Sequence, residues 1–441
     1  MCAAQDGRLD ELLEHGVFVI EQGESLAAGS IGHYRITGNT PAVSFVRWLG
    51  EPGSRELFGS VADDPATEAL LRRGFRYPQL RIVGSYLERL GAALQQTLES
   101  HEACTVALRT AVRSVRLLAG GGVRVTAEPT GDPSGVFSVT AERAVIAMGG
   151  CEPPGLKALA LLPGLTLAGY GDKLCHASAL IDDRIGLPPH LVEAVRETRS
   201  AVVVGGSHSA WSVAWVLLHD PVFRGSGGEP PRVTVLHRRP LLFFYTTVPK
   251  AKAAGYVFDD VLDVCPSSGH VYRFGGLRSP DPRALALAAV GPGSRKPPVR
   301  AVHLVDEPEV RTDARRALDE AGLVVAAVGY QARLPELAWE DGRRLEPARS
   351  DTGVVVTPEA ALVTAQGTVV PELLVYGLGA GLAADSGLAC EPSYTGRFDG
   401  VRLYQNEVGR IVLRSLLADP SSRAPAPAVG AGTADPATRR S

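Results

Sequence analysis

The chain has 441 residues, of which 45% are hydrophobic and 21% charged, and its formal net charge is −3. This length supports two or three domains with cores of their own, and the composition is ordinary for a globular protein. The charge gives no reason to expect nucleic acid or an anionic membrane as a partner. No apolar run reaches the roughly 20 residues that a membrane helix needs, and the first residues lack a signal-peptide pattern.

Six cysteines are spread widely along the chain, and no two of them are spaced as C-x-x-C. This spacing argues against a zinc site, a disulfide framework and dithiol redox chemistry. We therefore expect no metal, and a reducing cytoplasm as the compartment.

The first half of the chain predicts a mixture of helices and strands, beginning with a helix and a buried strand. The apolar run 17–20 is typical of a strand that is buried on both faces of a parallel sheet. Before it, leucines on one face predict an amphipathic helix over 6–15 that ends at Gly16. Further elements are expected at 85–98 (helix), 105–118 and 123–127 (β-structure) and 144–148 (a strand that stops on two glycines).

The second half begins with a strand–turn–helix–strand unit near Ser200. Such alternation predicts an α/β fold with parallel sheets, in which one dinucleotide-binding domain is inserted into another. The stretch 240–300 is rich in Pro, Gly and aromatic residues, which predicts an irregular cap. The remaining elements are expected as strands at 201–204, 233–236, 323–328 and 373–376, helices at 209–218 and 401–417, and a disordered tail at 419–441.

The turn after the strand at 201–204 is typical of a cradle for a dinucleotide pyrophosphate. Gly205 permits the tight turn, Gly206 lets the backbone approach the ligand, and Ala210 lets the helix pack closely on the strand. Amides at the start of the helix would bind the pyrophosphate. The pattern is imperfect, so a generic turn packed with small residues is the alternative. The candidate residues are Gly205, Gly206, Ser207, His208, Ser209 and Ala210.

Two arginines, Arg238 and Arg239, follow the second strand of this unit. Enzymes that use NAD usually carry an acid at this place for the ribose hydroxyls, whereas basic side chains suit a 2′-phosphate. The position therefore favours NADPH over NADH, with a solvated charge pair as the alternative.

Three further strand ends carry residues suited to a second dinucleotide, FAD. Glu21 ends the strand at 17–20, where it is placed to accept hydrogen bonds from an adenosine ribose. An isolated acid would be weak evidence, but glycines end two other strands. The candidate residues are Glu21, Gln22, Gly149, Gly150, Gly377, Leu378 and Gly379.

The ordered set of these motifs resembles the class B flavoprotein monooxygenases, and most of all their N-hydroxylating branch, the ornithine and lysine N-monooxygenases. The likeness covers about residues 15 to 415. It implies an FAD-binding part at 1–165, an NADPH-binding domain at 166–325 that includes the cap, and a return to the FAD-binding domain at 326–418. The motifs that carry it are Val-Ile-Glu-Gln22, Ala-Met-Gly-Gly150, Gly-Gly-Ser-His-Ser-Ala210, Ala-Val-Gly-Tyr330 and Tyr-Gly-Leu-Gly379.

The resemblance implies that NADPH reduces FAD, that oxygen adds at the flavin C4a to give a (hydro)peroxyflavin, and that a small amine or amino acid is hydroxylated, in secondary metabolism. No catalytic side chain is predicted. The expected partners are a small-molecule substrate and O2, and a homo-oligomer is not excluded. An NADPH-dependent flavin oxidoreductase without oxygenation and a degenerate, non-catalytic relative remain open as alternatives.

The sequence departs from this family before Glu21. The family's FAD glycine loop lies roughly 20 residues upstream of the matching acid, which places it at or before Met1. Either the start lies too late, which we favour, or the loop is lost and FAD affinity is poor. Without the strand that carries the loop, a parallel sheet would contain an unpaired gap.

Other residues carry less specific expectations, each with a structural alternative. Trp211 and Trp215 are expected in the core rather than against a nicotinamide. His176 lies in a segment that resembles the family's inter-domain linker, where it touches both cofactors or is purely structural. Arg35, Asn39 and Gln79 fall in segments that line the flavin in such folds, with solvated loop residues as the alternative. Residues 243–245 and 256–258 are expected to pack rather than to line a substrate cavity, and 404–406 are placed to face the flavin ring.

Overall fold

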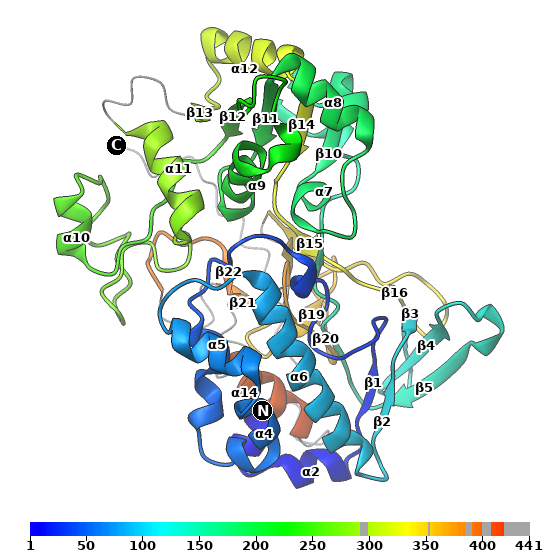
Figure 1. The fold of residues 1–441 in the computed structure, drawn as a ribbon. Coiled ribbons are helices and arrows are strands. Elements are labelled where there is room, and N and C mark those ends of the chain that lie inside the picture. The colour runs from blue at the N-terminus through cyan, green and yellow to red at the C-terminus, as the bar shows by residue number, and fades with distance from the viewer. Residues whose placement is uncertain (292–298, 352, 381, 384–389, 399–406, 419–441) are drawn as a thin grey trace.

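The computed structural model describes the chain except for residues 292–298, 352, 381, 384–389, 399–406 and 419–441. The expected tail 419–441, the residues 404–406 and the start of the expected helix at 401–417 thus lie outside the described residues. The fold is mixed α/β with two parts (Figure 1). We call the part from β10 to β14 the inserted domain and the segments on either side of it the split domain.

A five-stranded parallel sheet forms the centre of the inserted domain, in the order β10–β14–β11–β12–β13. The strand before the glycine turn, β11, lies in the middle and is buried along its whole length because helices cover both faces of the sheet. The strands are β10 (Leu174–His176), β11 (Ser200–Val204), β12 (Arg232–His237), β13 (Val299–His303) and β14 (Leu323–Ala326).

Alternate residues of this sheet pack into two separate cores. Val203 lies in the core that includes α9, whereas Val202 lies in the core that includes α12 on the opposite face. The helices of the domain are α7 (Ser178–Ile181), α8 (Pro189–Thr198), α9 (His208–His219), α11 (Pro280–Val290) and α12 (Pro308–Glu320).

The split domain combines strands from before and after the inserted domain. β6 pairs in parallel with β20, with Ala144 opposite Leu373, and β16 pairs with β3 in a four-stranded sheet of order β16–β3–β4–β5. The strands are β1 (Phe18–Ile20), β2 (Thr105–Ala107), β3 (Thr110–Leu117), β4 (Val123–Pro129), β5 (Phe137–Ala141), β6 (Ala144–Ile146), β16 (Glu336–Ala338), β19 (Ala361–Val363) and β20 (Val369–Val375).

Helices cover the lower part of the split domain (Figure 1). The long helix α6 buries Tyr86 against Trp48, whose indole N–H donates to the tyrosine oxygen at 2.8 Å. No helix within the described ranges is both long and apolar enough to cross a bilayer. The helices are α1 (Cys2–Gln5), α2 (Leu9–Glu14), α3 (Val43–Val46), α4 (Ser54–Ala62), α5 (Pro65–Arg73), α6 (Leu80–Glu99) and α14 (Glu407–Leu417).

Short antiparallel strand pairs complete the fold. All of them lie outside the inserted domain. The pairs are β7 (Gly150–Cys151) with β15 (Gln331–Ala332), β8 (Ala160–Leu162) with β9 (Leu165–Thr166), β17 (Arg349–Ser350) with β18 (Gly353–Val354), and β21 (Leu382–Ala383) with β22 (Arg397–Phe398).

The expected strand at 17–20 forms as β1, but it is not buried on both faces. Phe18 is 40% exposed, and among the described strands β1 pairs only with β2. Within the part of the chain that the structure describes, no ladder joins β1 to β6, whose Val145 is 39% exposed. The expectation of burial on both faces was wrong: Phe18 is exposed, and Val19 and Ile20 are only half-buried. Residues before β1 form α1 and α2 instead.

The expected irregular cap at 240–300 also differs from the structure. A short helix, α10 (Val248–Ala253), and isolated β-bridges fill its first part, as the composition suggests. Its C-terminal part contains α11, which packs against α9 and β13, and the first residues of β13 itself. The sequence does not predict α11, because this helix packs against more than one element and shows no single apolar face.

Candidate functional site

The glycine turn follows β11 at the centre of the inserted sheet, and only glycine fits its first position. Gly205 has a φ of +141°, and a Cβ there would lie 2.2 Å from the backbone oxygen of Ala327. A Cβ on Gly206 would lie 3.0 Å from the Cβ of His237. Ser207 precedes α9 without making a side-chain cap. The first amides of α9 are therefore available to an anion, as a pyrophosphate cradle requires.

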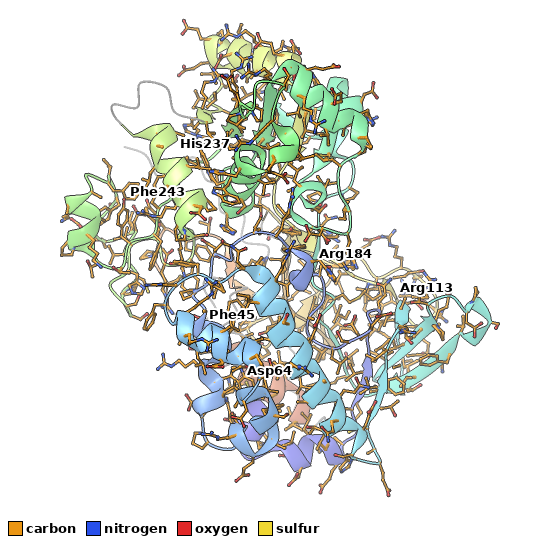
Figure 2. All side chains as sticks on the ribbon, viewed as in Figure 1. Phe45, Asp64, Arg113, Arg184, His237 and Phe243 are labelled. Carbon is orange, nitrogen blue, oxygen red and sulfur yellow. The ribbon has the colours of Figure 1, made fainter. Side chains whose placement is uncertain are left out.

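The two arginines that follow β12 lie beside this turn. β12 pairs with β11 in register up to Leu236, whose backbone oxygen accepts a hydrogen bond from Gly205 N at 2.8 Å. Arg238 and Arg239 are exposed, and neither makes an ion pair with any described residue. His237 before them is buried and stacks on the ring of His303, with centroids 5.1 Å apart (Figure 2). Two guanidinium groups without an ion-pair partner among the described residues thus lie at the carboxyl end of β12.

His208 links the glycine turn to the split domain. Its Nε2 lies 3.0 Å from the backbone oxygen of Thr37, so this nitrogen carries the proton and donates. Gln79 donates from its side-chain amide to the hydroxyl of Thr37 at 3.1 Å. Burial lowers the pKa of His208 to about 4, because the charged ring would lose its hydration. Sequence reasoning missed this contact, because Thr37 is far from His208 along the chain.

We expect His208 to make the fold less stable in acid. Its pKa is depressed in the folded state, so its contribution is complete above the unfolded value near 6.5 and is lost as pH falls towards 4. Between pH 7 and 4.5 the wild type should lose ~2 kcal/mol more unfolding free energy than His208→Gln. Urea titrations at several pH values measure this. His219→Gln, at the exposed end of α9, is the control, and equal acid sensitivity of all three proteins would contradict the assignment.

Three of the predicted loops converge where the two domains meet. β7 pairs antiparallel with β15, and Arg333 N donates to the backbone oxygen of Gly149 at 3.1 Å. A Cβ on Gly150 would lie 3.0 Å from side-chain atoms of both Leu378 and Tyr330. The motifs at 149–150, 329–330 and 377–379, which are far apart in sequence, are therefore neighbours in space.

Other glycines of the same loops have free space where a side chain would stand. Gly149, Gly329 and Gly377 have φ values of +70°, +93° and +111°, and a Cβ on any of them would meet no atom within 4 Å. A backbone without side chains and with free space beside it lets a ligand approach closely. This arrangement fits a flat ring system laid against the three loops.

Glu21 and Gln22 do not join these loops by any hydrogen bond or ion pair among the described residues. Glu21 ends β1, where its Oε1 accepts a hydrogen bond from Gly23 N at 2.6 Å. The carboxylate is half-buried and held by its own turn. Its assignment to a ribose remains a prediction.

A polar cluster around Glu152 lies at the crossing, the place where the chain passes from the split domain to the inserted domain. Ser178 donates to this carboxylate from its backbone N at 3.1 Å and from its hydroxyl at 2.5 Å. His176 Nδ1 lies 3.7 Å from Glu152 Oε2, and this buried nitrogen has no hydrogen-bond partner. Burial raises the pKa values of Tyr34 and Tyr330, and the charge of Glu152 adds to both shifts. His176 thus lies at the crossing, as its linker position predicts, and its contact with cofactors is untested.

Two polar residues from the segments that line the flavin in the resembled family join the domains. Arg35 donates to Asp220 at 2.5 Å and to the backbone oxygen of Leu180 at 2.6 Å, both in the inserted domain. Asn39 Oδ1 accepts the backbone N–H groups of Arg278 at 2.9 Å and Ser279 at 3.1 Å, which fixes the cap. Sequence reasoning missed both contacts because their partners are backbone groups and a distant aspartate.

The aromatic residues mostly pack in cores. Trp211 is fully buried, so its expected place in the core is confirmed, and Trp215 stacks on His219 at 4.5 Å. Phe243 is 2% exposed and contacts Tyr256 edge-on, which supports packing over a cavity (Figure 2).

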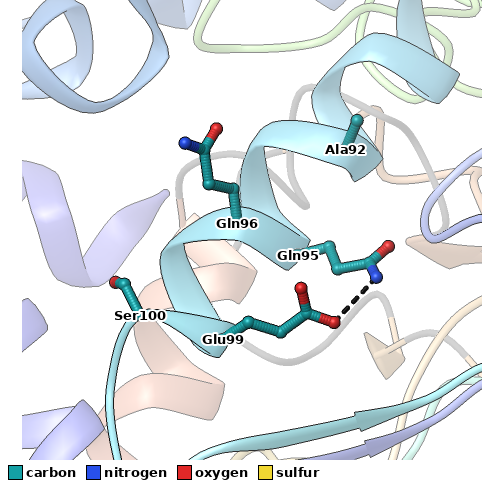
Figure 3. A pocket seen from close by; sticks show the side chains of 5 residues that line it. All are labelled: Ala92, Gln95, Gln96, Glu99 and Ser100. Carbon is teal, nitrogen blue, oxygen red and sulfur yellow. Dashed lines mark hydrogen bonds between the residues drawn. The ribbon is translucent and has the colours of Figure 1, made fainter.

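A shallow depression on the outer face of α6 is unrelated to these loops (Figure 3). One hydrogen bond, from Gln95 Nε2 to Glu99 Oε1 at 2.8 Å, lies across it. It is lined by side chains of a single helix end, so it encloses no ligand. Within the described residues, no group of three His, Cys, Asp or Glu side chains could hold a metal ion.

Comparisons with known proteins agree with this geometry. No protein-family model matches the chain. A CMP-5′-(3-aminopropyl)phosphonate hydroxylase from Streptomyces rubellomurinus is 37% identical over 426 residues, which cover 95% of this chain and 94% of the relative.

Solved structures with the same fold are more distant in sequence. The cadaverine monooxygenase of Erwinia amylovora, solved with FAD, has a TM-score of 0.52 at 14% identity and covers 90% of this chain and 87% of its own. The ornithine hydroxylase of Pseudomonas aeruginosa has a TM-score of 0.51 at 13% identity, with 93% and 96% covered. The Kutzneria ornithine N-hydroxylase, solved with reduced FAD, NADP+ and L-ornithine, has a TM-score of 0.50 at 17% identity, with 90% and 92% covered.

Proposed function

Because the chain belongs to the N-hydroxylating branch of the class B flavin monooxygenases, we propose that it hydroxylates the primary amine of an aminoalkylphosphonate carried on a cytidine nucleotide. The observation that carries this proposal is the 37% identity to a hydroxylase of such a compound, over nearly the full length of both chains. The cytoplasm as its compartment and any oligomeric state remain predictions.

The glycine turn and the arginines after β12 are the residues that we assign to NADPH. The free amides of residues 207–210 suit the pyrophosphate, and Ala210 is buried against the turn. Arg238 and Arg239 suit the 2′-phosphate, because both are exposed and unpaired and a guanidinium binds phosphate in a fork.

The convergent loops are the residues that we assign to FAD, which activates O2 once NADPH has reduced it. Gly149, Gly329 and Gly377 provide backbone without side chains, and their open space fits the flavin ring. Gly150, Leu378 and Gly379 hold the loops together. The described residues offer no second glycine turn that would cradle the FAD pyrophosphate, so our assignment covers the ring and not the adenosine end.

The proposal is tested by supplying the purified protein with FAD, NADPH, O2 and CMP-5′-(3-aminopropyl)phosphonate. We expect NADPH oxidation that depends on the substrate and a product that has gained one oxygen atom, detected by mass spectrometry. NADPH oxidation with hydrogen peroxide and no such product would favour the oxidoreductase without oxygenation. No flavin binding even in excess FAD would favour a non-catalytic relative.

Loss of the two arginines after β12 should change cofactor preference. In Arg238→Ala and Arg239→Ala we expect the KM for NADPH to rise about 10- to 100-fold, because a hydrogen bond to a charged group contributes roughly 1.5–3 kcal/mol. The KM for NADH should stay nearly constant, since NADH lacks the 2′-phosphate. Arg232→Ala, at the other end of the same strand, is the control. A parallel rise in both KM values would show that the arginines do not read the 2′-phosphate.

A further inference from the structure

Two histidines stack on each other at the carboxyl ends of neighbouring strands. β12 pairs with β13 in parallel register, which places His237 opposite His303. Residues in register share a face of the sheet, so the two rings lie side by side, with centroids 5.1 Å apart and planes inclined by only 5°. His237 is buried and His303 is exposed. The stack therefore reaches the surface at the same edge of the sheet as the glycine turn.

Each histidine holds the backbone of one of the two arginines that follow β12. His303 Nε2 lies 3.2 Å from the backbone oxygen of Arg238, and His237 Nδ1 lies 2.8 Å from that of Arg239. A carbonyl oxygen can only accept, so both ring nitrogens carry a proton and donate. Burial lowers the pKa of His237, so this ring is uncharged at neutral pH and keeps its proton on Nδ1.

His237 also packs against the glycine turn. A Cβ on Gly206 would lie 3.0 Å from the Cβ of His237. The backbone of His237 is fixed from the other side, because its oxygen accepts a hydrogen bond from Leu304 N at 2.8 Å, just beyond β13. The segment with the two arginines is thus tied at both of its carbonyl groups, beside the turn that we assign to the pyrophosphate.

We propose that His237 and His303 are positioning residues for the 2′-phosphate of NADPH, with His303 acting through Arg238 and His237 through Arg239. This inference rests on the assignment of the two arginines in the proposed function. An arginine on a fixed backbone has less freedom to lose when it binds a phosphate, so its affinity is higher. NADH lacks the 2′-phosphate, so the histidines would add to the preference for NADPH.

The exposed His303 allows a test that opens no core. His303→Phe keeps a ring that can stack on His237 but removes the donor to Arg238, whereas His303→Gln keeps a side-chain N–H and loses the stack. Isothermal titration calorimetry of the protein supplied with FAD gives the Kd for NADP+ and for NAD+. In His303→Phe we expect the Kd for NADP+ to rise about 3- to 10-fold and that for NAD+ to stay within about twofold. His303→Gln should restore most of the lost affinity.

His219→Phe is the matched control. His219 is also exposed, stacks on Trp215 and contacts a backbone oxygen through Nδ1 at 2.8 Å, but it lies at the end of α9 far from the glycine turn. Its replacement should change neither Kd. A double-mutant cycle then separates positioning from a general effect on the fold. Once Arg238 is replaced by Ala, His303→Phe should change the Kd for NADP+ by less than about twofold.

An NADP+ affinity of His303→Phe equal to that of the wild type, or equal losses for NADP+ and NAD+, would overturn the inference. So would a full effect of His303→Phe in the Arg238→Ala background. If Arg238→Ala itself leaves NADP+ affinity unchanged, the assignment of the arginines fails and the inference fails with it. A wild type that shows the expected NADP+ results but forms no hydroxylated product refutes the proposed hydroxylation and leaves the role of the histidines standing.

Discussion

Gly205→Ala is expected to abolish NADPH binding and to lower the unfolding free energy by about 3 kcal/mol or more. The new Cβ would lie 2.2 Å from the backbone oxygen of Ala327, and the φ of +141° is one that side chains rarely adopt. Because β11 and β14 are buried neighbours, neither backbone can move away without breaking the sheet. Urea unfolding and NADP+ titration measure the two effects.

Two other glycines give the comparison that this result needs. A Cβ on Gly227, in an exposed loop of the same domain, meets nothing within 4 Å, so Gly227→Ala should be nearly neutral. Gly206→Ala should fall between them, because its Cβ would meet the side chain of His237 at 3.0 Å. Gly205→Ala with normal NADP+ affinity would show that the turn is only a structural connection.

Trp211→Ala should lower the unfolding free energy by about 3–5 kcal/mol, the usual cost of removing a fully buried large aromatic side chain. Trp211 lies in the core between α9 and the sheet. Trp211→Phe should cost much less, since the buried indole N–H has no hydrogen-bond partner to lose. Thermal and urea unfolding measure the difference.

The same pair of variants decides between a core residue and a residue that contacts the nicotinamide. If Trp211 only packs, the KM for NADPH of folded Trp211→Phe should equal that of the wild type. Trp215→Ala, which removes a half-buried ring stacked on His219, should cost less than Trp211→Ala. A raised KM in Trp211→Phe with unchanged stability would place the ring against the cofactor.

The parts of the fold that the sequence predicted are those encoded by neighbouring residues. The strand at 201–204, its glycine turn and the following helix occupy one continuous stretch, so their order and chemistry can be read directly. The glycine-ended loops at 149–150, 329–330 and 377–379 were each recognisable in the sequence. Their closeness in space is seen only in the structure.

The parts that could not be predicted depend on contacts between distant residues. Asn39 gives no local sign that it will accept the amide of Arg278, because any backbone N–H could serve. The exposure of Phe18 depends on which strand lies beside β1, and an apolar run carries no information about its neighbours. His208 was predicted only as a residue of the glycine turn, and its neighbours in sequence do not indicate that Thr37 lies against it.

The chain passes between its two domains twice, and the passages run side by side. β7, before the inserted domain, pairs antiparallel with β15, after it, with Cys151 opposite Gln331. The two segments of the split domain also hold each other through the β6–β20 and β3–β16 ladders. A protease that cuts one passage would therefore release no fragment. The intact passage would keep the inserted domain attached, and the two ladders would hold the segments of the split domain together. If the gene were divided at the codons for one passage, it would encode two polypeptides that could associate through these ladders.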